Sequence, residues 1–322
     1  MSRRLRARAL WTLQDGLLRG GKLAARARRV IPDAWLAPLR RRMAPLRVAP
    51  LEFESDVPLE ASFPLRVAAS TQNMPERLSI LVPVYGNARL CLRCLRSVQA
   101  YSPPNVELVI VDDASPDDSR VVLEAWCRQH ATPLHVNAQN LGFPATVNRA
   151  AKLAQGELLV ILNSDVVVTP GWLEGLCQAL RDHPRAGLIG PRGSDTGDVA
   201  TLSGQYRTVP ELEAFAASLA GRRARRVDKL SLFCALVPRR HFEATGGLDE
   251  GYDRGMFDDD DLCRALAARG LEVLLCESVF VHHSAGASFR RLSPREYMAR
   301  FEVNRARFEH KWATHWRAYV PK

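Results

Sequence analysis

The sequence predicts an α/β fold with a mainly parallel central sheet and helices on both faces. Short runs rich in apolar and β-branched residues, such as 78–85, 106–111 and 158–162, are typical of strands buried on both sides. Between them lie segments whose apolar residues recur at helical spacing. Turn residues, such as Gly86 and Asn87, separate the two kinds of segment. Strands that alternate with helices in this way form parallel sheets with right-handed connections.

The predicted strands are short apolar runs that end at Gly, Pro, Asp or Asn. In chain order they cover residues 78–85, 106–111, 134–136, 158–162, 187–190, 230–237, 272–276 and 279–281. The predicted helices carry an apolar stripe and also end at turn residues. They cover residues 88–100, 119–130, a segment from the 140–148 turn to 155, 172–182, 241–245, 257–269 and 294–315. For example, Pro170 precedes the helix at 172–182, and Gly270 ends the helix at 257–269.

The chain of 322 residues divides into three parts by composition. Residues 1–76 form a basic helical arm followed by a Pro-containing linker, residues 77–290 form the α/β domain, and residues 291–322 form a helical extension. No stretch approaches 18 consecutive apolar residues, and the N-terminus lacks the apolar segment of a secretory signal. Seven scattered Cys fit a reduced, cytoplasmic chain.

Most of the positive charge lies in the arm. Residues 1–50 hold 13 Arg and Lys against two Asp, a net charge of +11, whereas the whole chain has +10. The arm therefore suits an anionic membrane surface, which would place the protein peripherally at the inner face of the membrane. The alternative is that its apolar face docks on the α/β domain. Nucleic acid is the less favoured partner because only Trp11 and Trp35 interleave the basic residues.

Acidic residues follow two of the predicted strands. Asp112 and Asp113 follow the strand at 106–111, and Asp165 follows the strand at 158–162. Strand C-termini in an open α/β sheet face the crevice where ligands bind. With a later histidine, these acids could hold a hard divalent cation with a phosphate ligand. Alone, Asp165 is equally compatible with a turn or a helix cap.

Four consecutive acids, residues 258–261, open the helix at 257–269. Acids in a first helical turn are favoured by the dipole, by about 0.3–1 kcal/mol each, and two would suffice. Four adjacent like charges raise carboxylate pKa values, which suits a general base. The alternative is a solvated acidic cap, which fits Asp260 best.

Common nucleotide and hydrolase motifs are missing. The first strand is not followed by Gly-Xaa-Gly-Xaa-Xaa-Gly, and neither a P-loop nor a Gly-Xaa-Ser-Xaa-Gly turn occurs. The sequence therefore disfavours dehydrogenases, P-loop enzymes and α/β-hydrolases.

The chain resembles the nucleotide-sugar glycosyltransferases of family 2, which have the GT-A fold, and within them a rhamnosyltransferase-like subgroup. The resemblance covers roughly residues 77–290 and rests on motifs in the family's order. They are Ser79-Ile-Leu-Val-Pro-Val-Tyr85, Val111-Asp-Asp-Ala-Ser115, Asn140-Leu-Gly142 with Asn148, Asn163-Ser-Asp165, Gly246-Gly-Leu-Asp-Glu250, Phe257-Asp-Asp-Asp-Asp-Leu-Cys263 and His283.

The resemblance implies a role for each matching residue. The donor would contact Pro83, Tyr85, Asp112, Asp113, Asn140, Gly142, Asn148, Asn163 and Ser164. Asp165 and His283 would hold Mn²⁺ or Mg²⁺, with His282 the less favoured choice. Asp259 would deprotonate the acceptor, while Asp258 and Asp261 would orient the acceptor or brace the site. Asn163 replaces the first acid of the family's Asp-Xaa-Asp motif, and Asp258 replaces a Glu.

The resemblance also implies the activity. We expect an inverting, metal-dependent transferase that moves a hexosyl or deoxyhexosyl group from a nucleoside-diphosphate sugar to a hydroxyl of a glycan or lipid-linked acceptor, in surface polysaccharide biosynthesis. The alternative is a glycan- or nucleotide-binding scaffold that has lost turnover.

Overall fold

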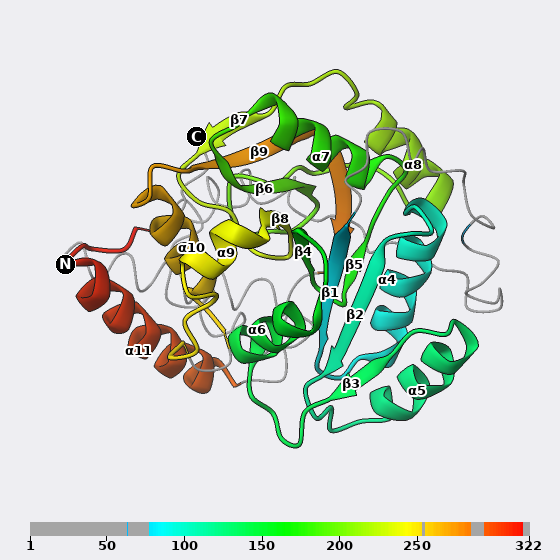
Figure 1. Cartoon of the computed structure of the whole chain (residues 1–322), viewed down its shortest axis with the longest axis horizontal. Coiled ribbons are helices and arrows are strands. Elements are labelled where there is room, and N and C mark those ends of the chain that lie inside the picture. The colour runs from blue at the N-terminus through cyan, green and yellow to red at the C-terminus, as the bar shows by residue number, and fades with distance from the viewer. Residues whose placement is uncertain (1–62, 64–76, 253–254, 285–292, 318–322) are drawn as a thin grey trace, which may run out of the picture. The chain divides into compact units, whose positions relative to one another are not determined.

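The computed structural model describes residue 63 and residues 77–252, 255–284 and 293–317 (Figure 1). The basic arm predicted over residues 1–50, and its membrane or docking role, lie outside the described residues. Among the described residues, nine strands form the sheet, in the order β3-β2-β1-β4-β8-β6-β9-β5, with β7 paired to β9. No helix in these ranges is both long and apolar enough to cross a bilayer.

The first half of the sheet is parallel, as the alternation of strands and helices predicts. Its strands are β1 (Leu78–Val84), β2 (Glu107–Asp112), β3 (Leu134–Val136) and β4 (Leu158–Leu162). The connecting helices are α4 (Ala88–Tyr101), α5 (Ser119–Gln129) and α6 (Phe143–Leu153).

The chain reverses direction across the sheet between β1 and β4. From β1 through β2 to β3 it moves one way, and β4 then returns to the other side of β1. With right-handed connections, α4 and α5 fall on one face of the sheet and α6 on the other. The helix contacts agree, since α4 packs with α5, and α6 packs against β1 and β2. The chain after β4 packs onto α4, since the Val168 amide donates to the Ser97 hydroxyl at 3.1 Å. The strand order reverses beside β1, and the strand ends next to such a reversal are the usual ligand position in open α/β sheets.

The second half of the sheet is mixed, which the periodicity did not predict. Its strands are β5 (Val166–Val167), β6 (Ala186–Gly193), β7 (Arg225–Val227), β8 (Cys234–Pro238) and β9 (Glu272–His283). Strand β8 is antiparallel to both β4 and β6, and β9 is antiparallel to β5 and β7 but parallel to β6.

Two predicted strand boundaries were wrong. Strands expected at 272–276 and 279–281 form one strand, β9, because the polar break at Glu277 is neutralised: its carboxylate binds Arg192 at 2.7 Å and Arg225 at 2.6 Å. The strand expected from 230 begins at Cys234. Upstream of it, the Leu230 amide lies 3.5 Å from the Cys263 thiol, and the Ser231 amide donates to Asp198 at 2.7 Å.

The remaining helices cover the second half of the sheet or flank it. They are α7 (Trp172–Asp182), α8 (Val209–Ala217), α9 (Arg239–Ala244), α10 (Asp258–Ala267) and α11 (Pro294–Trp312). The sequence prediction missed α8, although Thr208 and Glu211 form a capping box there.

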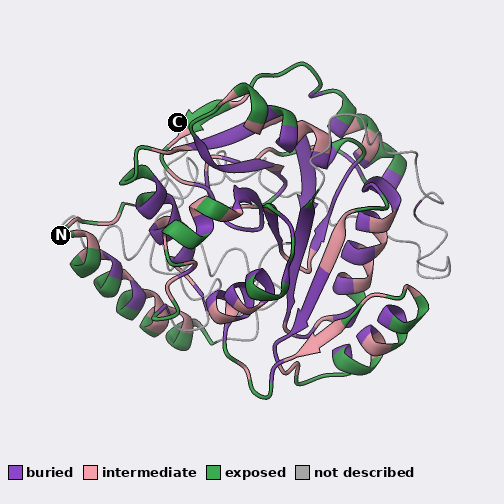
Figure 2. Cartoon of the chain, in the orientation of Figure 1, coloured by how far each residue is buried: buried purple, intermediate pink, exposed green. Residues whose placement is uncertain are grey.

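The central strands are buried along nearly their whole length (Figure 2). All seven Cys are free thiols inside the core, and Cys91 and Cys94 lie buried on α4. The lone Cys-Xaa-Xaa-Cys is thus part of the packing, as the absence of a second pair predicts.

Arg239 connects the C-terminal end of α6 to the residue that leads into β4. Its guanidinium donates to the carbonyls of Ala151 at 2.9 Å, Ala154 at 2.8 Å and Gly156 at 2.7 Å. The first two carbonyls belong to the end of α6, where a cation is favoured by the helix dipole. Gly156 leads directly into β4, so one side chain fixes the relative position of α6 and β4.

We expect Arg239→Met to lower the free energy of unfolding by about 2–4 kcal/mol, because three carbonyls lose a charged donor. Urea unfolding followed by circular dichroism measures the change. Arg240→Met is the matched control, since Arg240 is the exposed neighbour. Equal stability of the two variants would contradict this role of Arg239.

Candidate active site

The carboxyl ends of β1 and β4 lie side by side where the strand order reverses, and the turn after β1 contributes the first predicted contacts. Pro83 is buried in β1, and the half-buried Tyr85 follows the strand end. The next two amides are held by the loop after β2: Gly86 donates to the Ser115 hydroxyl at 2.7 Å, and Asn87 donates to Asp117 at 2.9 Å. The two strand-end loops therefore form one connected rim.

The two acids at the end of β2 have different surroundings. Asp113 uses both oxygens, accepting hydrogen bonds from Asn137 at 2.7 Å, from Leu141 at 2.8 Å and from Gly142 at 2.9 Å. Asp112 binds Ser115 through Oδ1, whereas its Oδ2 is buried and has no partner in the described part of the chain. Burial also raises the pKa of Asp112. Of the two, Asp112 has the free oxygen that a ligand could occupy.

Two of the predicted donor contacts, Asn140 and Gly142, shape the turn before α6. Asn140 accepts from the Gly142 amide at 3.0 Å, and Gly142 adopts φ +86°, which favours glycine. Asn148 lies further along α6, where its amide nitrogen donates to the Leu248 carbonyl at 2.8 Å and to Glu250 at 2.9 Å. Asn148 thus ties α6 to the loop before α10, and its role as a donor contact stays a prediction.

Asn163, Ser164 and Asp165 form the turn between β4 and β5. The Asn163 amide donates to the Phe233 carbonyl at 2.8 Å, which fixes the start of the turn. The side-chain Oδ1 of Asn163 is buried and, among the described residues, unpartnered. Together with Asp112 Oδ2, it is a second buried acceptor that the protein itself leaves unsatisfied, which is expected where a ligand completes the hydrogen bonding.

Asp165 and His283 face each other although 118 positions separate them. Strand β5 pairs antiparallel with the end of β9, with Val166 opposite His283. As a result, His283 Nε2 lies 3.3 Å from Asp165 Oδ1. The other ring nitrogen, Nδ1, lies 2.7 Å from the Asp195 carbonyl. A carbonyl can only accept, so Nδ1 carries hydrogen and Nε2 is the nitrogen available to a metal ion.

His282 points away from this pair, as alternation along a strand requires. It is buried, and its Nδ1 lies 3.0 Å from the Tyr206 hydroxyl. Burial lowers the pKa of His282 to about 4, so it is neutral. His283, and not His282, is therefore the histidine that faces Asp165, and its role as a metal ligand stays a prediction.

Asp165 and His283 shift each other's pKa values. Burial acts to raise the pKa of Asp165, but the hydrogen bond and charge of His283 outweigh it and lower that pKa. Burial acts to lower the pKa of His283, but Asp165 outweighs it and raises that pKa. Without a metal, the pair therefore favours a carboxylate and an imidazolium, and a cation would displace the imidazolium proton.

Two of the four consecutive acids bind the C-terminal part of the chain. Asp260 pairs with Lys229 at 2.9 Å and accepts from the Trp316 indole at 3.1 Å. Asp261 pairs with Lys311 at 2.8 Å and accepts from the Trp312 indole at 2.8 Å. Asp261 therefore connects α10 to the C-terminal part of the chain, and its predicted role at the acceptor stays a prediction.

Asp258 and Asp259 are the two acids that remain for chemistry. Asp258 is buried, while Asp259 is half-buried and accepts from the Asp260 amide at 2.8 Å. Burial raises the pKa of both, and neighbouring carboxylates raise it further. Lys229 partly offsets this effect at Asp259. Asp259, the more accessible of the two, is the better placed to take a proton from a second substrate.

A short segment connects the acids to the Asp165–His283 pair. At one end Lys229 pairs with Asp260; at the other, the Phe233 ring stacks on His283 with centroids 5.1 Å apart. The backbone of five residues spans at most about 17 Å when fully extended. One short stretch of backbone therefore contacts both the acids and the Asp165–His283 pair.

Sequence reasoning missed several residues that support this site. Ser194 exchanges hydrogen bonds with the His283 backbone, at 2.9 and 3.0 Å, and Asp195 orients the ring. Phe233, Lys229 and Ser115 were also missed. The only signal was the Gly-, Ser- and Thr-rich composition of the 193–204 loop, because these contacts connect segments that are distant in sequence.

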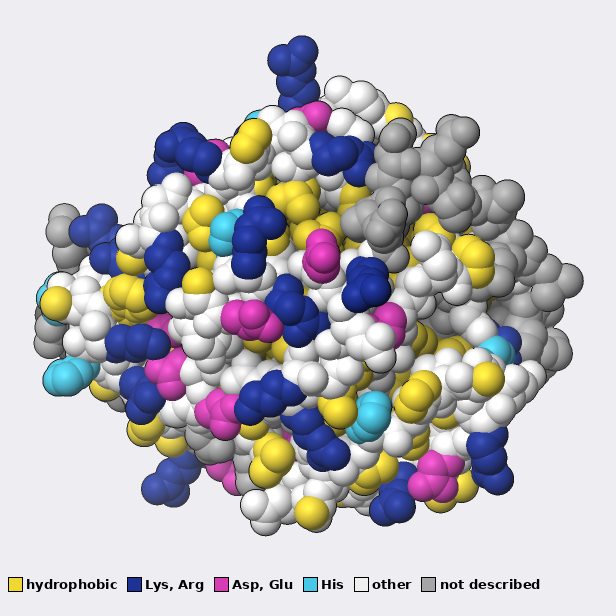
Figure 3. All heavy atoms as spheres, viewed as in Figure 1, with side chains coloured by type: hydrophobic (Ala, Val, Ile, Leu, Met, Phe, Trp, Pro, Cys, Tyr) yellow, Lys and Arg dark blue, Asp and Glu magenta, His cyan; other side chains and the backbone are white. Residues whose placement is uncertain are grey.

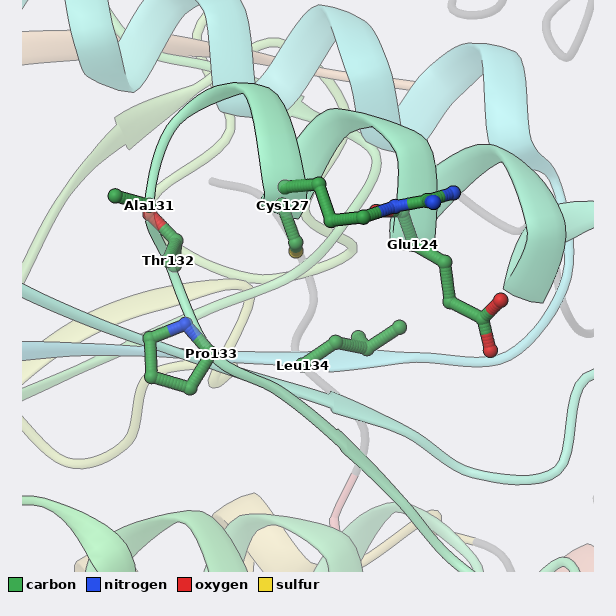
Figure 4. A pocket seen from close by; sticks show the side chains of 7 residues that line it. Glu124, Cys127, Ala131, Thr132, Pro133 and Leu134 are labelled. Carbon is green, nitrogen blue, oxygen red and sulfur yellow. The ribbon is translucent and has the colours of Figure 1, made fainter.

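The described surface also has a hollow and a charge distribution that do not involve the predicted site residues. A hollow of about 490 Å³ lies between α5 and β3, and its lining includes Glu124, Cys127, Pro133 and Leu134 (Figure 4). On the face shown in Figure 3, basic side chains of the described residues are interspersed with acidic ones. That distribution agrees with the near-neutral charge of the chain beyond the arm.

Known proteins resemble the chain in sequence and in fold. The chain is 28% identical to glycosyltransferase GlyG of Streptococcus pneumoniae over 118 residues, which is 36% of this chain and 39% of GlyG. It is 26% identical to N-acetylglucosaminyl-diphospho-decaprenol L-rhamnosyltransferase of Mycobacterium tuberculosis over 246 residues, covering 67% of this chain and 79% of that protein. The chain spans about two fifths or less of the length of the first curated relatives that it matches.

The fold matches that of a mannosyltransferase from Pyrobaculum calidifontis in complex with GDP-Man and Mn²⁺. The TM-score is 0.54 at 18% identity, over 80% of this chain and 70% of that one. The expected GT-A fold is thereby confirmed. Residues 79–244, just over half of the 322, match the family described as glycosyl transferase family 2. The chain therefore belongs to glycosyl transferase family 2.

Proposed function

We propose that the protein transfers a sugar from a nucleoside-diphosphate sugar to a hydroxyl of a glycan or lipid-linked acceptor, with a divalent cation and with inversion. The observation that carries this proposal is the Asp165–His283 pair after β4, with the buried acceptors of Asp112 and Asn163 at neighbouring strand ends. Family membership supports the reaction class. The fold of Mn²⁺-bound transferases supports a cation.

The residues present fit a hard divalent cation. One carboxylate oxygen and one imidazole nitrogen converge, and Asp195 fixes the ring so that Nε2 faces the carboxylate. Such a mixed set suits Mn²⁺ or Mg²⁺ when phosphate oxygens complete the ligands. When bound, the cation would stabilise the negative charge that develops on the departing nucleoside diphosphate.

Other side chains would bind the donor and deprotonate the acceptor. Asp112 Oδ2 and Asn163 Oδ1 would accept hydrogen bonds from the donor, and the turn after β1 would contact its base and ribose. Asp259 would take the proton of the acceptor hydroxyl as that oxygen attacks the anomeric carbon. Since one base acts on the face opposite the leaving group, displacement is direct and the configuration inverts. Surface polysaccharide assembly and a place at the inner face of the membrane stay predictions from the sequence.

We expect nucleotide sugars to stabilise the protein only when Mn²⁺ is present. In a thermal-shift panel of UDP-, GDP- and dTDP-sugars, saturation at 100-fold over Kd adds about 2.7 kcal/mol of stability. His283→Gln should remove most of this Mn²⁺-dependent shift, whereas His282→Gln should lower the basal Tm but keep the shift. The proposal fails if no nucleotide sugar shifts the wild type with Mn²⁺.

We expect substitutions of Asp112 and of Asp113 to have different effects on stability and on donor binding. Asp113→Ala should lower the free energy of unfolding by about 2–4 kcal/mol, because three loop donors lose their acceptor. Asp112→Asn should change it by about 1 kcal/mol or less while weakening donor binding, because it removes a buried charge but not the Ser115 contact. Urea unfolding and donor titration measure the two effects. A reversed pattern would make Asp113 the donor contact.

The base should give the reaction a characteristic pH dependence. Because the pKa of Asp259 is raised, kcat/KM should fall as the pH drops through a value above the usual Asp pKa of about 3.9. Asp259→Asn should lower kcat by about 10²–10⁴-fold. Lys229→Gln should move the acidic limb of the profile to higher pH, because Lys229 lowers the pKa of Asp259.

The control for this charge change is Lys152→Gln, at an exposed position on α6. Profiles are measured at saturating Mn²⁺. An acidic limb that does not move in Lys229→Gln, or that moves to lower pH, would exclude Asp259 as the titrating base.

A further inference from the structure

The backbone just before the acids is strained. Gly255, Met256 and Phe257 have φ values of +98°, +75° and +71°, so three consecutive residues lie in the left-handed region. For residues with a Cβ this conformation costs roughly 1–2 kcal/mol each. Such strain persists only where surrounding contacts enforce it, and it concentrates at functional sites. The turn therefore needs an external support.

Helix α11 supplies that support through a buried amide. Asn304 is 1% exposed, and its Nδ2 donates to the Gly255 carbonyl at 2.9 Å and to the Met256 carbonyl at 3.3 Å. A buried amide is costly unless it is hydrogen-bonded, and an apolar residue could have filled the same space. The hydrogen bonds, rather than packing, explain an asparagine at this position.

The supported peptides lead directly into the acid pair. The two carbonyls that Asn304 binds belong to Gly255 and Met256, and only Phe257 separates them from Asp258. The Phe257 carbonyl accepts from the Asp261 amide at 2.9 Å, so the supported turn continues into the first hydrogen bond of α10. Because peptide groups are planar and rigid, the orientation of these peptides limits where the Asp258 side chain can lie.

A second contact fixes the same helix from the other side. Lys311 bridges Asp261 and Asp249, at 2.8 Å to each, so α11 holds both the first turn of α10 and the loop before it. Tyr252, Phe257 and Phe308 form a small apolar cluster between these contacts. In Figure 1, α11 lies along the side of the domain next to α10.

We propose that α11 positions the acid pair of the proposed transferase, with Asn304 as the positioning residue that acts on Asp258 and Asp259 through the Gly255–Met256 peptide. This inference rests on the proposed function. It assigns a role to a segment beyond residues 79–244, which carry the family match. The proposed donor site, built on β1, β2, β4 and β9, does not include the hydrogen bonds of Asn304.

The test separates turnover from donor binding. The probe is hydrolysis of the nucleotide sugar that gives the largest thermal shift with Mn²⁺, with water as acceptor. We expect Asn304→Ala and Asn304→Asp each to lower kcat by about 10–100-fold, because a small misplacement of a reacting group has effects of this size. Donor KM should stay within about twofold, since ground-state donor contacts are unchanged. Val303→Ala, on the exposed face of α11, should match the wild type.

The isosteric Asn304→Asp variant distinguishes positioning from packing. It keeps the shape but lacks the donor, so wild-type kcat in this variant would overturn the proposal, as would a rise in donor KM equal to the loss in kcat. If neither Asn304 variant folds, Lys311→Gln is tested instead. We expect it to lower kcat and leave donor KM unchanged, and the same two outcomes would overturn the proposal.

Hydrogen exchange makes the inference testable independently of the reaction. Amides of residues 255–261 should exchange faster in Asn304→Ala than in the wild type, while those of residues 160–168 should not change. Unchanged exchange at 255–261 overturns the inference. A wild type that neither binds nor hydrolyses any nucleotide sugar overturns the proposed function instead.

Discussion

The site depends on one short antiparallel contact, the pairing of β5 with the end of β9. Val166 lies opposite His283 and Val167 opposite His282. Because side chains alternate along a strand, this register decides which histidine faces Asp165 and which enters the core beside Tyr206. A shift by one residue would exchange the two histidines. Ser194 holds the register from the other side, because its hydroxyl both accepts from and donates to the His283 backbone.

The parallel half of the fold and its strand-end acids could be predicted from sequence because both are local properties. Buried strands appear as apolar runs, and a carboxylate after such a run lies at the strand end whatever the rest of the chain does. The mixed half could not be predicted in this way. Glu277 looked like a strand break, yet Arg192 and Arg225 neutralise it and β9 continues. The approach of Asp165 to His283 followed from family resemblance, since spacing alone does not reveal it.

The four consecutive acids show how position determines the role of identical side chains. In a helix, successive residues point about 100° apart, so neighbours meet different surroundings. Asp260 and Asp261 each face a cation, Lys229 and Lys311, and each accepts from an indole of the C-terminal part. Within the described residues, Asp258 and Asp259 have no such ion pair, and burial raises their pKa values. The sequence indicated that four acids exceed what helix capping needs, but only the structure separates the two pairs.

The Asp165–His283 pair and the acids of α10 lie on different parts of the fold, so the contacts between these parts determine how the two groups are aligned. The Asp165–His283 pair lies at the edge of the sheet, whereas the acids lie on a helix that is preceded by three residues with positive φ. The segment from Lys229 to Phe233 connects them, contacting Asp260 at one end and His283 at the other. Its backbone groups bind Asp198 and Cys263, and its Phe233 carbonyl accepts from the Asn163 amide that follows β4. The proposed transfer requires the acceptor base and the leaving-group site at a fixed separation. The segment would limit that separation, and α11 would hold the turn before the acids.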